Sequence, residues 1–159
     1  MTLAVGSKAP DFTLPSSDGQ QVGKVALSEL VGHENIVLAF FPLAFTSVCR
    51  EELCEFKDQL SQFNQLDAKV FGISVDSPFS LNAFSKAEGL NFPLLSDFNK
   101  EVSSAYGVLY ESLLDFKGVA KRSVFVVDKG GLIQYRWVSE DPKVKPDLNE
   151  ITGALKTLA

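Results

Sequence analysis

The sequence has few of the residues that bind metal ions: one histidine and two cysteines occur among its 159 residues. A structural zinc site needs four such ligands at characteristic short spacings. His33, Cys49 and Cys54 are too few and are wrongly spaced, and His33 is better explained as a solvated loop residue. We therefore expect no metal ion and no other bound cofactor.

Clusters of positive charge and long apolar runs are also missing. The formal net charge is −5, and no group of basic residues suits a nucleic-acid backbone or an anionic membrane. The longest apolar run is too short to cross a bilayer. Residues 1–6 lack the basic and apolar regions of a secretory signal. We expect a cytoplasmic protein with no nucleic-acid or membrane partner.

What the sequence does contain is enough apolar material for one sizeable core. Hydrophobic residues make up 45% of the chain, and thirteen of them are phenylalanines. This length suits one compact unit, so we expect residues 1–159 to form a single domain. Two cysteines in such a chain indicate catalysis or redox sensing more than a structural disulfide.

The segment from Ile36 to Asn64 organises the rest of the chain. Ile36–Phe41 is apolar at every position, which is typical of a central strand with a parallel neighbour. Pro42 ends this strand, and a helix is expected over Ser47–Asn64. The buried face of that helix would carry hydrophobic residues at helical spacing, namely Leu53, Phe56, Leu60 and Phe63.

Cys49 falls in the first turn of this expected helix, for which Thr46 or Ser47 is a suitable N-cap. Unpaired backbone N–H groups point toward that position, and the helix dipole is positive there. Both effects favour the thiolate, which is the reactive form of cysteine. The pattern therefore indicates a reactive thiol at Cys49.

The remaining elements follow the order of an α/β fold with a mixed sheet. An all-parallel dinucleotide-binding fold would not end in a hairpin and a helix, whereas a thioredoxin-like fold flanked by helices does. An N-terminal β-hairpin extension precedes it. The expected segments are a hairpin over 12–27 with its turn at Ser16–Gly19, strands Lys69–Val75, Arg122–Asp128 and Leu132–Val138, helices Phe79–Ala87, Asn99–Tyr106 and Asp147–Leu158, an extended piece Phe92–Ser96, and a loop with some helix over Val108–Ala120.

The spacing Pro42-x-x-x-Thr46-x-x-Cys49 resembles the signature of the peroxiredoxins. The resemblance extends over nearly the whole chain, through segments 6–12, 92–97 and 121–128. The context of residues 40–46 is similar to the alkyl hydroperoxide reductase E type, usually described as one-cysteine enzymes. The resemblance implies a thiol-dependent peroxidase that reduces hydrogen peroxide and organic hydroperoxides.

The same resemblance implies a role for each matched residue. Cys49 would be the peroxidatic cysteine, which attacks the O–O bond and becomes a sulfenic acid. Thr46 would hydrogen-bond the peroxide, and Pro42 would shield the sulfur from water. Arg122 would hold the thiolate and the departing oxygen with its forked charge. Glu52, one helical turn after Cys49, would orient that arginine.

The second cysteine leaves two alternatives open, of which the sequence favours the first. The Cys49-x-x-x-x-Cys54 spacing resembles the resolving arrangement of the bacterioferritin-comigratory (Q) type, which implies an intramolecular disulfide recycled by thioredoxin, a glutaredoxin-like protein or a low-molecular-weight thiol. On a helix, five residues rise about 7.5 Å, so bridging requires the first turns to unwind. Alternatively, Cys54 is a small core residue and an external thiol attacks Cys49 directly.

Two readings of other classes remain beside the peroxidase. A general thiol–disulfide oxidoreductase normally has Cys-x-x-Cys, and the observed spacing is two residues longer. A peroxide-sensing or chaperone-like protein could use the same oxidation without turnover. Peroxide consumption that depends on Cys49 separates these classes.

The sequence also suggests a homodimer, as many peroxiredoxins pair through loops near the reactive cysteine. Apolar residues that could meet there are Phe45, Phe79, Leu113, Leu114 and Phe116. Many members carry an additional arginine shortly after Asp-x-x-Gly, where this chain has Gln134, with Arg136 two residues later. Whether Arg136 takes part in the site is left open by the sequence.

Overall fold

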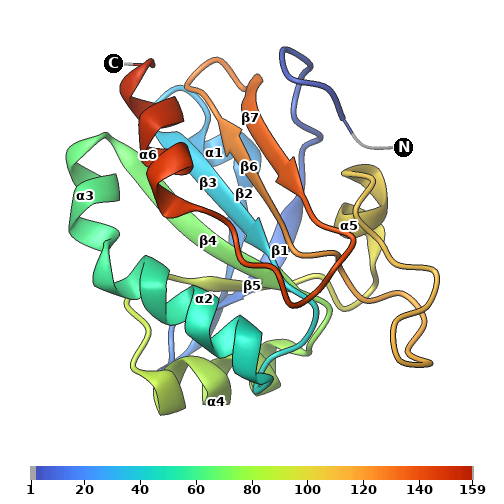
Figure 1. The fold of residues 1–159 in the computed structure, drawn as a ribbon. Helices are drawn as coiled ribbons and strands as arrows, with labels where there is room; N and C mark the ends of the chain where they lie inside the picture. The colour runs from blue at the N-terminus through green and yellow to red at the C-terminus, as the bar shows by residue number, and fades with distance from the viewer. Residues whose placement is uncertain (1–2, 159) are drawn as a thin grey trace.

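The computed structural model describes residues 3–158. Its centre is a seven-stranded sheet in the order β2-β1-β5-β4-β3-β6-β7, drawn in Figure 1. The strands are β1 (Thr13–Ser17), β2 (Val22–Ala26), β3 (Asn35–Phe40), β4 (Ala68–Ser74), β5 (Leu94–Ser96), β6 (Ser123–Val127) and β7 (Ile133–Val138). The helices are α1 (Leu27–Leu30), α2 (Ser47–Asp58), α3 (Leu60–Gln65), α4 (Pro78–Glu88), α5 (Glu101–Ala105) and α6 (Leu148–Lys156).

The sheet is mixed, as the sequence predicts. β3, β4 and β5 run parallel to one another, while β6 pairs antiparallel with β3 and β7 pairs antiparallel with β6. The N-terminal hairpin β1–β2 joins the sheet through β5, again antiparallel. The α/β fold with a thioredoxin-like mixed sheet and an N-terminal hairpin is therefore confirmed.

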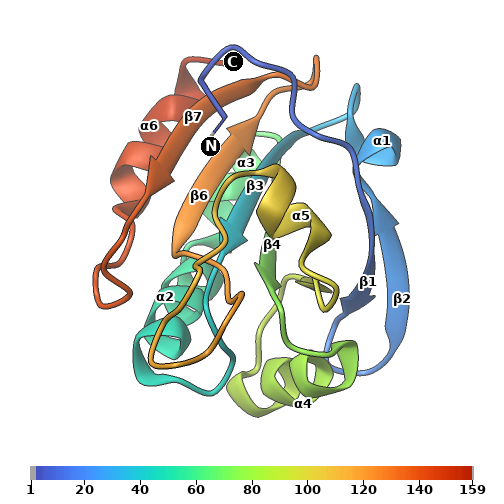
Figure 2. The same ribbon diagram turned by 90° about the vertical axis from the view of Figure 1, so that its right-hand side faces the viewer.

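Every residue of β3 is buried, because this strand separates two hydrophobic cores. Val37 and Ala39 face the core formed with α2, α3, α4 and α6. Ile36 and Leu38 face the other core, which includes side chains of α1 and α5. In Figure 2 the strands are spread from β7 on the left to β2 on the right, with α6 and α2 at the left, α1 at the right and α5 in front of the sheet.

Two sequence-based boundaries are wrong. The helix expected over Ser47–Asn64 is two helices, because Gln59 leaves the helical conformation (φ −105°, ψ 9°) between α2 and α3. The first hairpin turn lies later than Ser16–Gly19, since Ser16 and Ser17 still pair within the sheet. The Asp18 carboxylate accepts the backbone N–H groups of Gln20 and Gln21, which closes the turn there.

The segment 108–120 contains no helix, contrary to expectation. Leu109 bridges to Ala120 and Leu113 bridges to Phe116, so the segment is a long folded-back loop. Leu114 and Asp115 at its tip have φ of 51° and 66°, in the left-handed region, which a right-handed helix excludes. The loop extends to the right-hand side of the molecule in Figure 1.

The topology brings three distant segments to one edge of the sheet. Parallel strands β3 and β4 end at this edge, so the connections after Phe40 and after Ser74 lie side by side. β6 runs in the opposite direction and begins there, with Ser123 paired to Phe40. Arg122, the residue before Ser123, is thereby placed beside the start of α2.

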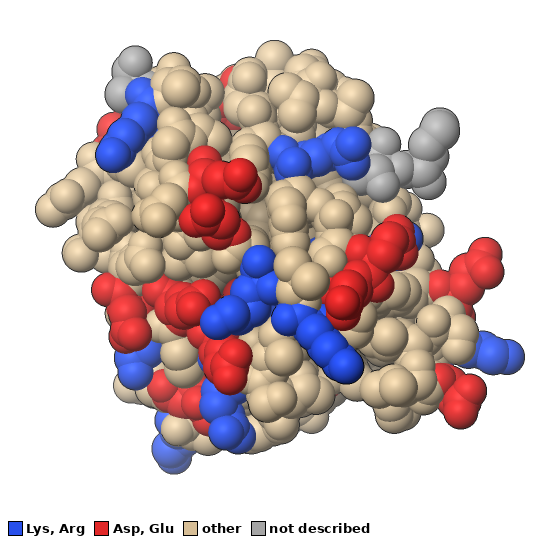
Figure 3. Space-filling view, in the orientation of Figure 1, with Lys and Arg blue, Asp and Glu red and all other residues tan. Residues whose placement is uncertain are grey.

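The surface carries charges of both signs in alternation on the face shown in Figure 3. Ion pairs account for part of this pattern, including Lys145 with Glu51 and Glu55 on α2. Within residues 3–158, no helix is long and apolar enough to cross a membrane.

Candidate active site

Cys49 lies in the first turn of α2, as predicted, and its side chain is fully shielded from solvent. Thr46 occupies the N-cap position, also as predicted, but its hydroxyl does not cap the helix. It donates instead to the carbonyl oxygen of Leu43, at 2.7 Å. The first-turn N–H groups of α2 are therefore not covered by the Thr46 side chain, and the hydroxyl oxygen keeps its lone pairs for another donor.

Arg122 is 2% exposed and its guanidinium is held from three directions. Nη2 donates to Cys49 Sγ at 3.2 Å, and Nη1 donates to Glu52 Oε1 at 2.7 Å. Nε donates to the carbonyl oxygen of Pro142 at 2.9 Å. The structure thus brings together Cys49, Glu52 and Arg122, which the sequence separates by up to 73 positions.

Burial acts on both charged partners of this cluster. It raises the pKa of Glu52 to about 7, although the adjacent Arg122 works in the opposite direction. For Arg122, burial works to lower the pKa, but Glu52 and Cys49 outweigh it and raise the pKa. Among the described residues Glu52 Oε2 has no hydrogen-bond partner, so this oxygen is free to carry the proton.

A cavity of about 250 Å³ opens over Cys49. Its polar lining residues beside Cys49 are Thr46, Ser47, Arg122 and Lys143, and Pro42, which is buried, forms part of the wall. The rest of the lining is mainly apolar and comes from the start of α2 and from the loop 108–120. These apolar residues are Leu43, Val48, Leu113, Leu114 and Phe116.

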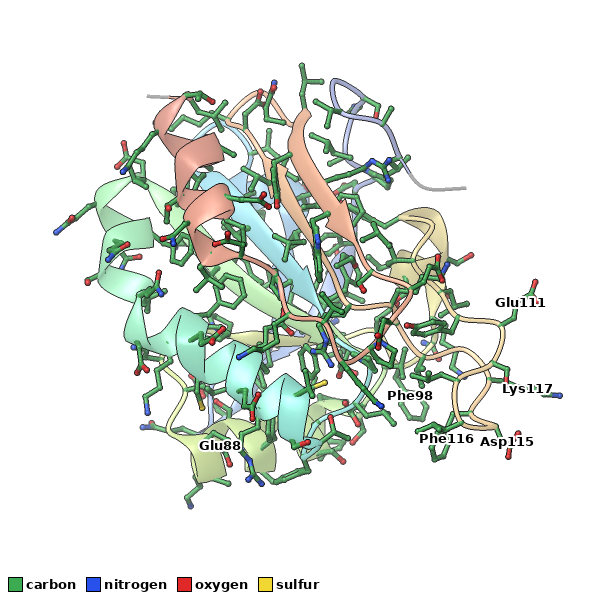
Figure 4. All side chains as sticks on the ribbon, viewed as in Figure 1. Glu88, Phe98, Glu111, Asp115, Phe116 and Lys117 are labelled. Atoms are coloured by element: carbon green, nitrogen blue, oxygen red, sulfur yellow. The ribbon has the colours of Figure 1, made fainter. Side chains whose placement is uncertain are left out.

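Cys54 lies apart from this cluster, half-buried beside α4. Its Sγ is 3.8 Å from Glu88 Oε1, and Glu88 also pairs with Arg50 at 3.2 Å. Glu88 is labelled in Figure 4, where α4 passes below α2. Burial, followed by the charge of Glu88, raises the pKa of the Cys54 thiol. Both cysteines are free thiols, and α2 is unbroken between them.

The other residues singled out in the sequence lie outside the cluster. Arg136 is exposed on β7 and pairs with Phe125 of β6. Phe125 lies two residues after Ser123, which begins β6 and directly follows Arg122. His33 is exposed. Within residues 3–158, no three His, Cys, Asp or Glu side chains are grouped so that they could hold a metal ion.

Two contributions to the site were missed from the sequence. The Pro142 carbonyl has no side-chain signal, because any residue at that position offers the same acceptor. The loop 108–120 lines the cavity, whereas the sequence led us to expect its residues Leu113, Leu114 and Phe116 only at a dimer contact near the reactive cysteine. A run of apolar residues without regular periodicity, such as Leu113–Leu114, was the only available signal.

Comparisons with known proteins agree on one family. Residues 5–136 match the model of the AhpC/TSA family. Alkyl hydroperoxide reductase E of Mycobacterium tuberculosis is 40% identical over 158 residues, which cover 98% of both chains. The chloroplastic 2-cysteine peroxiredoxin of Chattonella marina var. antiqua is 41% identical over 146 residues, covering 87% of this chain and 72% of that protein.

The structural comparison gives the same answer. The reduced 2-Cys peroxiredoxin of Plasmodium vivax superposes with a TM-score of 0.87 at 29% identity, covering 96% of this chain and 80% of that one. Some relatives are much longer than this chain, which spans 52% of the length of the chloroplastic 2-Cys peroxiredoxins of spinach and Arabidopsis.

The pKa of Glu52 predicts how stability depends on pH. Between about pH 4.5 and 7 the folded protein keeps a proton on Glu52 that the unfolded chain has released. The contribution of Glu52 to the free energy of unfolding is therefore fully present below pH 4.5 and lost as pH rises through 7. The comparison is made in a Cys49→Ser background, which removes thiol ionisation. In that background, the free energy of unfolding of the protein with Glu52, minus that of the Glu52→Gln variant, should fall by up to about 3 kcal/mol across this pH window.

Urea unfolding at several pH values measures this difference. Glu51→Gln is the matched control, because Glu51 is on the same helix with its side chain 61% exposed, and it should show little pH dependence. If the difference in free energy of unfolding between the Glu52 protein and Glu52→Gln stayed constant or rose with pH, the effect of Arg122 on the pKa of Glu52 would outweigh the effect of burial.

Proposed function

Because the chain belongs to the AhpC/TSA family, the peroxiredoxins, which are thiol-dependent peroxidases, we propose that it reduces hydrogen peroxide and organic hydroperoxides at Cys49. The observation that carries the proposal is the contact between Arg122 Nη2 and Cys49 Sγ at 3.2 Å, on a helix whose start carries Pro42 and Thr46 at the family spacing.

The proposed reaction begins with the Cys49 thiolate. Its sulfur attacks the oxygen of the peroxide that bears hydrogen, an S–O bond forms and the O–O bond breaks. Cys49 becomes a sulfenic acid, and the departing alkoxide or hydroxide takes up a proton to leave as an alcohol or water. Because Arg122 remains charged and its fork is already fixed, it stabilises negative charge as it moves from sulfur to the leaving oxygen.

Thr46 and Pro42 support this chemistry in different ways. The Thr46 hydroxyl hydrogen is engaged by Leu43, so its oxygen is oriented to accept the O–H of a hydroperoxide. Pro42 is buried in the cavity wall and has no N–H group to attract water. Glu52 holds the guanidinium through Nη1 and acts as a positioning residue.

The lining of the cavity supports organic hydroperoxides as substrates beside hydrogen peroxide. Leu43, Val48 and the loop residues Leu113, Leu114 and Phe116 offer apolar surface to an alkyl tail. Cys49, Thr46 and Arg122 offer polar groups where the peroxide group would react, and Ser47 and Lys143 are the other polar residues of the lining. This separation of apolar and polar surface fits a molecule with one reactive polar end.

For the reduction of the sulfenic acid we propose attack by an external thiol. The new thiol sulfur bonds to Cys49 sulfur and water leaves, and a second thiol then displaces Cys49 as a disulfide forms between the two external thiols. The donor would be a low-molecular-weight thiol, thioredoxin or a glutaredoxin-like protein. Cys54 has a raised pKa, which leaves it mainly as the unreactive thiol.

Contacts along α2 further support the external route. An intramolecular disulfide would require the first turns of α2 to unwind, since the two cysteines are five residues apart on a continuous helix. Unwinding would disturb the buried ion pair of Glu52 with Arg122. It would also disturb the surface pair of Arg50 with Glu88 and the contacts of Lys145 with α2.

A homodimer is proposed from exposed apolar residues, of which Leu114 and Phe116 also line the cavity. Phe45, Phe79, Phe98, Leu114 and Phe116 are between 51% and 82% exposed. Figure 4 shows Phe98 and Phe116 on the same side of the molecule. So much exposed aromatic surface is typical of a protein interface, and a second copy of this chain offers the same surface in return.

Replacement of the central residues should abolish or greatly slow peroxide turnover. With dithiothreitol as reductant, Cys49→Ser should have no measurable peroxidase activity, because the sulfur that Arg122 contacts would be gone. Arg122→Lys should lose about 100-fold in rate constant, since lysine cannot bind Cys49 and Glu52 at once. Arg136→Lys is the matched control and should remain within about 2-fold of wild type. Peroxide turnover by Cys49→Ser would overturn the proposed function.

The oxidised species distinguishes the two recycling routes. After one equivalent of peroxide, intact-mass analysis of the wild-type protein should show the gain of one oxygen, trapped by a sulfenic-acid reagent. Cys54→Ser should give the same species and keep its turnover with an external thiol. Loss of two hydrogens in the wild type, absent in Cys54→Ser, would instead establish Cys54 as the resolving cysteine.

The proposed dimer can be tested by sedimentation velocity of the reduced protein at micromolar concentration. The wild type should sediment as a dimer, and Phe79→Asp should shift it to monomer because a charge would enter the apolar interface. Val22→Asp, on the edge strand β2, is the control and should remain dimeric. A monomeric wild type over this concentration range would rule out the dimer.

A further inference from the structure

Asp76 lies just after β4, at the sheet edge where the loop that precedes α2 also begins. Its side chain is partly buried and points toward that loop. Asp76 Oδ2 accepts the backbone N–H of Ala44 at 2.8 Å. A residue from the β4–α4 connection therefore holds the segment that carries Pro42 and Thr46.

Asp76 is itself held by two neighbouring strands, through its carboxylate by β4 and through its backbone by β4 and β5. Ser74 Oγ, at the end of β4, donates to the same oxygen, Oδ2, at 2.6 Å. The backbone N–H of Asp76 donates to Ser74 Oγ, and its carbonyl oxygen accepts from Ser96 Oγ of β5 at 2.6 Å. Ser74 and Ser96 are buried, so Asp76 presents its carboxylate from a rigid position.

The loop that Asp76 holds has an unfavourable backbone conformation. Phe45 follows Ala44 and has φ of 67°, in the left-handed region, which residues with a β-carbon seldom adopt. The Phe45 ring packs against Phe84 of α4, with centroids 5.0 Å apart. Such a turn persists only where the surrounding structure imposes it, and the Ala44 hydrogen bond is one of the contacts that do so.

This turn sets the direction of the residues on either side of it. Thr46 comes directly after Phe45, and its hydroxyl bonds to Leu43, directly before Ala44. The path of the chain through Ala44 and Phe45 thus determines where the Thr46 oxygen lies relative to Cys49. A different path would misplace Thr46 without moving Cys49, which α2 holds separately.

We propose that Asp76 is a positioning residue of the peroxidase site, whose carboxylate holds Ala44 N–H and so keeps the left-handed turn at Phe45 that aims Thr46 toward the peroxide. The proposal rests on the proposed function, because it concerns the reaction of Cys49 with peroxide. Asp76 contacts neither Cys49 nor the cavity lining, and it acts through Ala44 and Thr46.

The test compares two reactions of Cys49 in the same variants. Asp76→Ala should lower the second-order rate constant for peroxide about 30-fold, which is typical of losing a hydrogen bond to a charged group. Its rate of alkylation by iodoacetamide should stay within about 3-fold, since alkylation does not use Thr46. Asp76→Asn, which can keep an oxygen at the Oδ2 position, should restore peroxide reactivity to within about 3-fold of wild type.

A double-mutant cycle shows whether Asp76 acts through Thr46. In a Thr46→Val background, Asp76→Ala should cost less than about 3-fold, because the group that it positions is gone. An equal loss in both backgrounds would overturn the proposal, as would an equal loss of peroxide and iodoacetamide reactivity. Asp58→Ala, which removes an exposed carboxylate at the end of α2, is the control and should match wild type.

The outcomes separate this proposal from the function on which it rests. If wild-type protein consumes peroxide through Cys49 and Asp76→Ala is equally fast, the peroxidase assignment stands and the role of Asp76 is wrong. If wild-type protein does not consume peroxide, both fall. Thermal unfolding of each variant, with kinetics measured well below its midpoint, ensures that the compared proteins are folded.

Discussion

The site depends on one buried ion pair, between Arg122 and Glu52. Removing two charges from water costs several kcal/mol, and only close, well-oriented contacts offset that cost. The 2.7 Å contact between Nη1 and Oε1 meets this requirement and leaves Nη2 aimed at Cys49. The pair therefore stabilises less by its own strength than by fixing one geometry, because any displacement would leave a buried charge without its partner.

This constraint explains why the surrounding elements are held as they are. β6 must begin where β3 ends, since only that register brings Arg122 to the first turn of α2. The connection before α6 must pass close enough for the Pro142 carbonyl to accept from Nε. Lys145 lies a few residues later in the same connection. It bonds to Glu55 and so attaches the connection to α2.

Much of this site was predictable because local chemistry and global topology agree there. The apolar run Ile36–Phe41, the break at Pro42 and the polar helix after Thr46 place Cys49 in a first turn without any tertiary information. Arg122 was found through its resemblance to a family segment, not through periodicity. Glu52 was expected to orient the arginine, and the observed contact has the required geometry, although its catalytic contribution remains a proposal.

The errors arose where tertiary contacts override the local pattern. The apolar spacing of residues 47–64 continues through Gln59, so periodicity alone could not show the break between α2 and α3. Leu114 and Asp115 adopt left-handed backbone conformations, which are not the conformations that these residue types favour in isolation. The fold of segment 108–120 therefore could not be predicted from composition. The role of Asp76 could not be predicted from the sequence, because its bond to Ala44 joins the connections that follow two different strands.

The long sequence separation within the cluster has a consequence for the order of folding. Cys49 and Arg122 are 73 residues apart, and their contact requires β3 to have paired with β6. We expect contacts of this kind to form late in folding, because closing a long loop costs chain entropy before the contact can offset that cost. A growing or partly folded chain therefore carries an ordinary thiol at position 49. The contacts that the proposed peroxide reaction uses are complete only after β6 has paired with β3, so an incomplete chain carries Cys49 without Arg122 beside it.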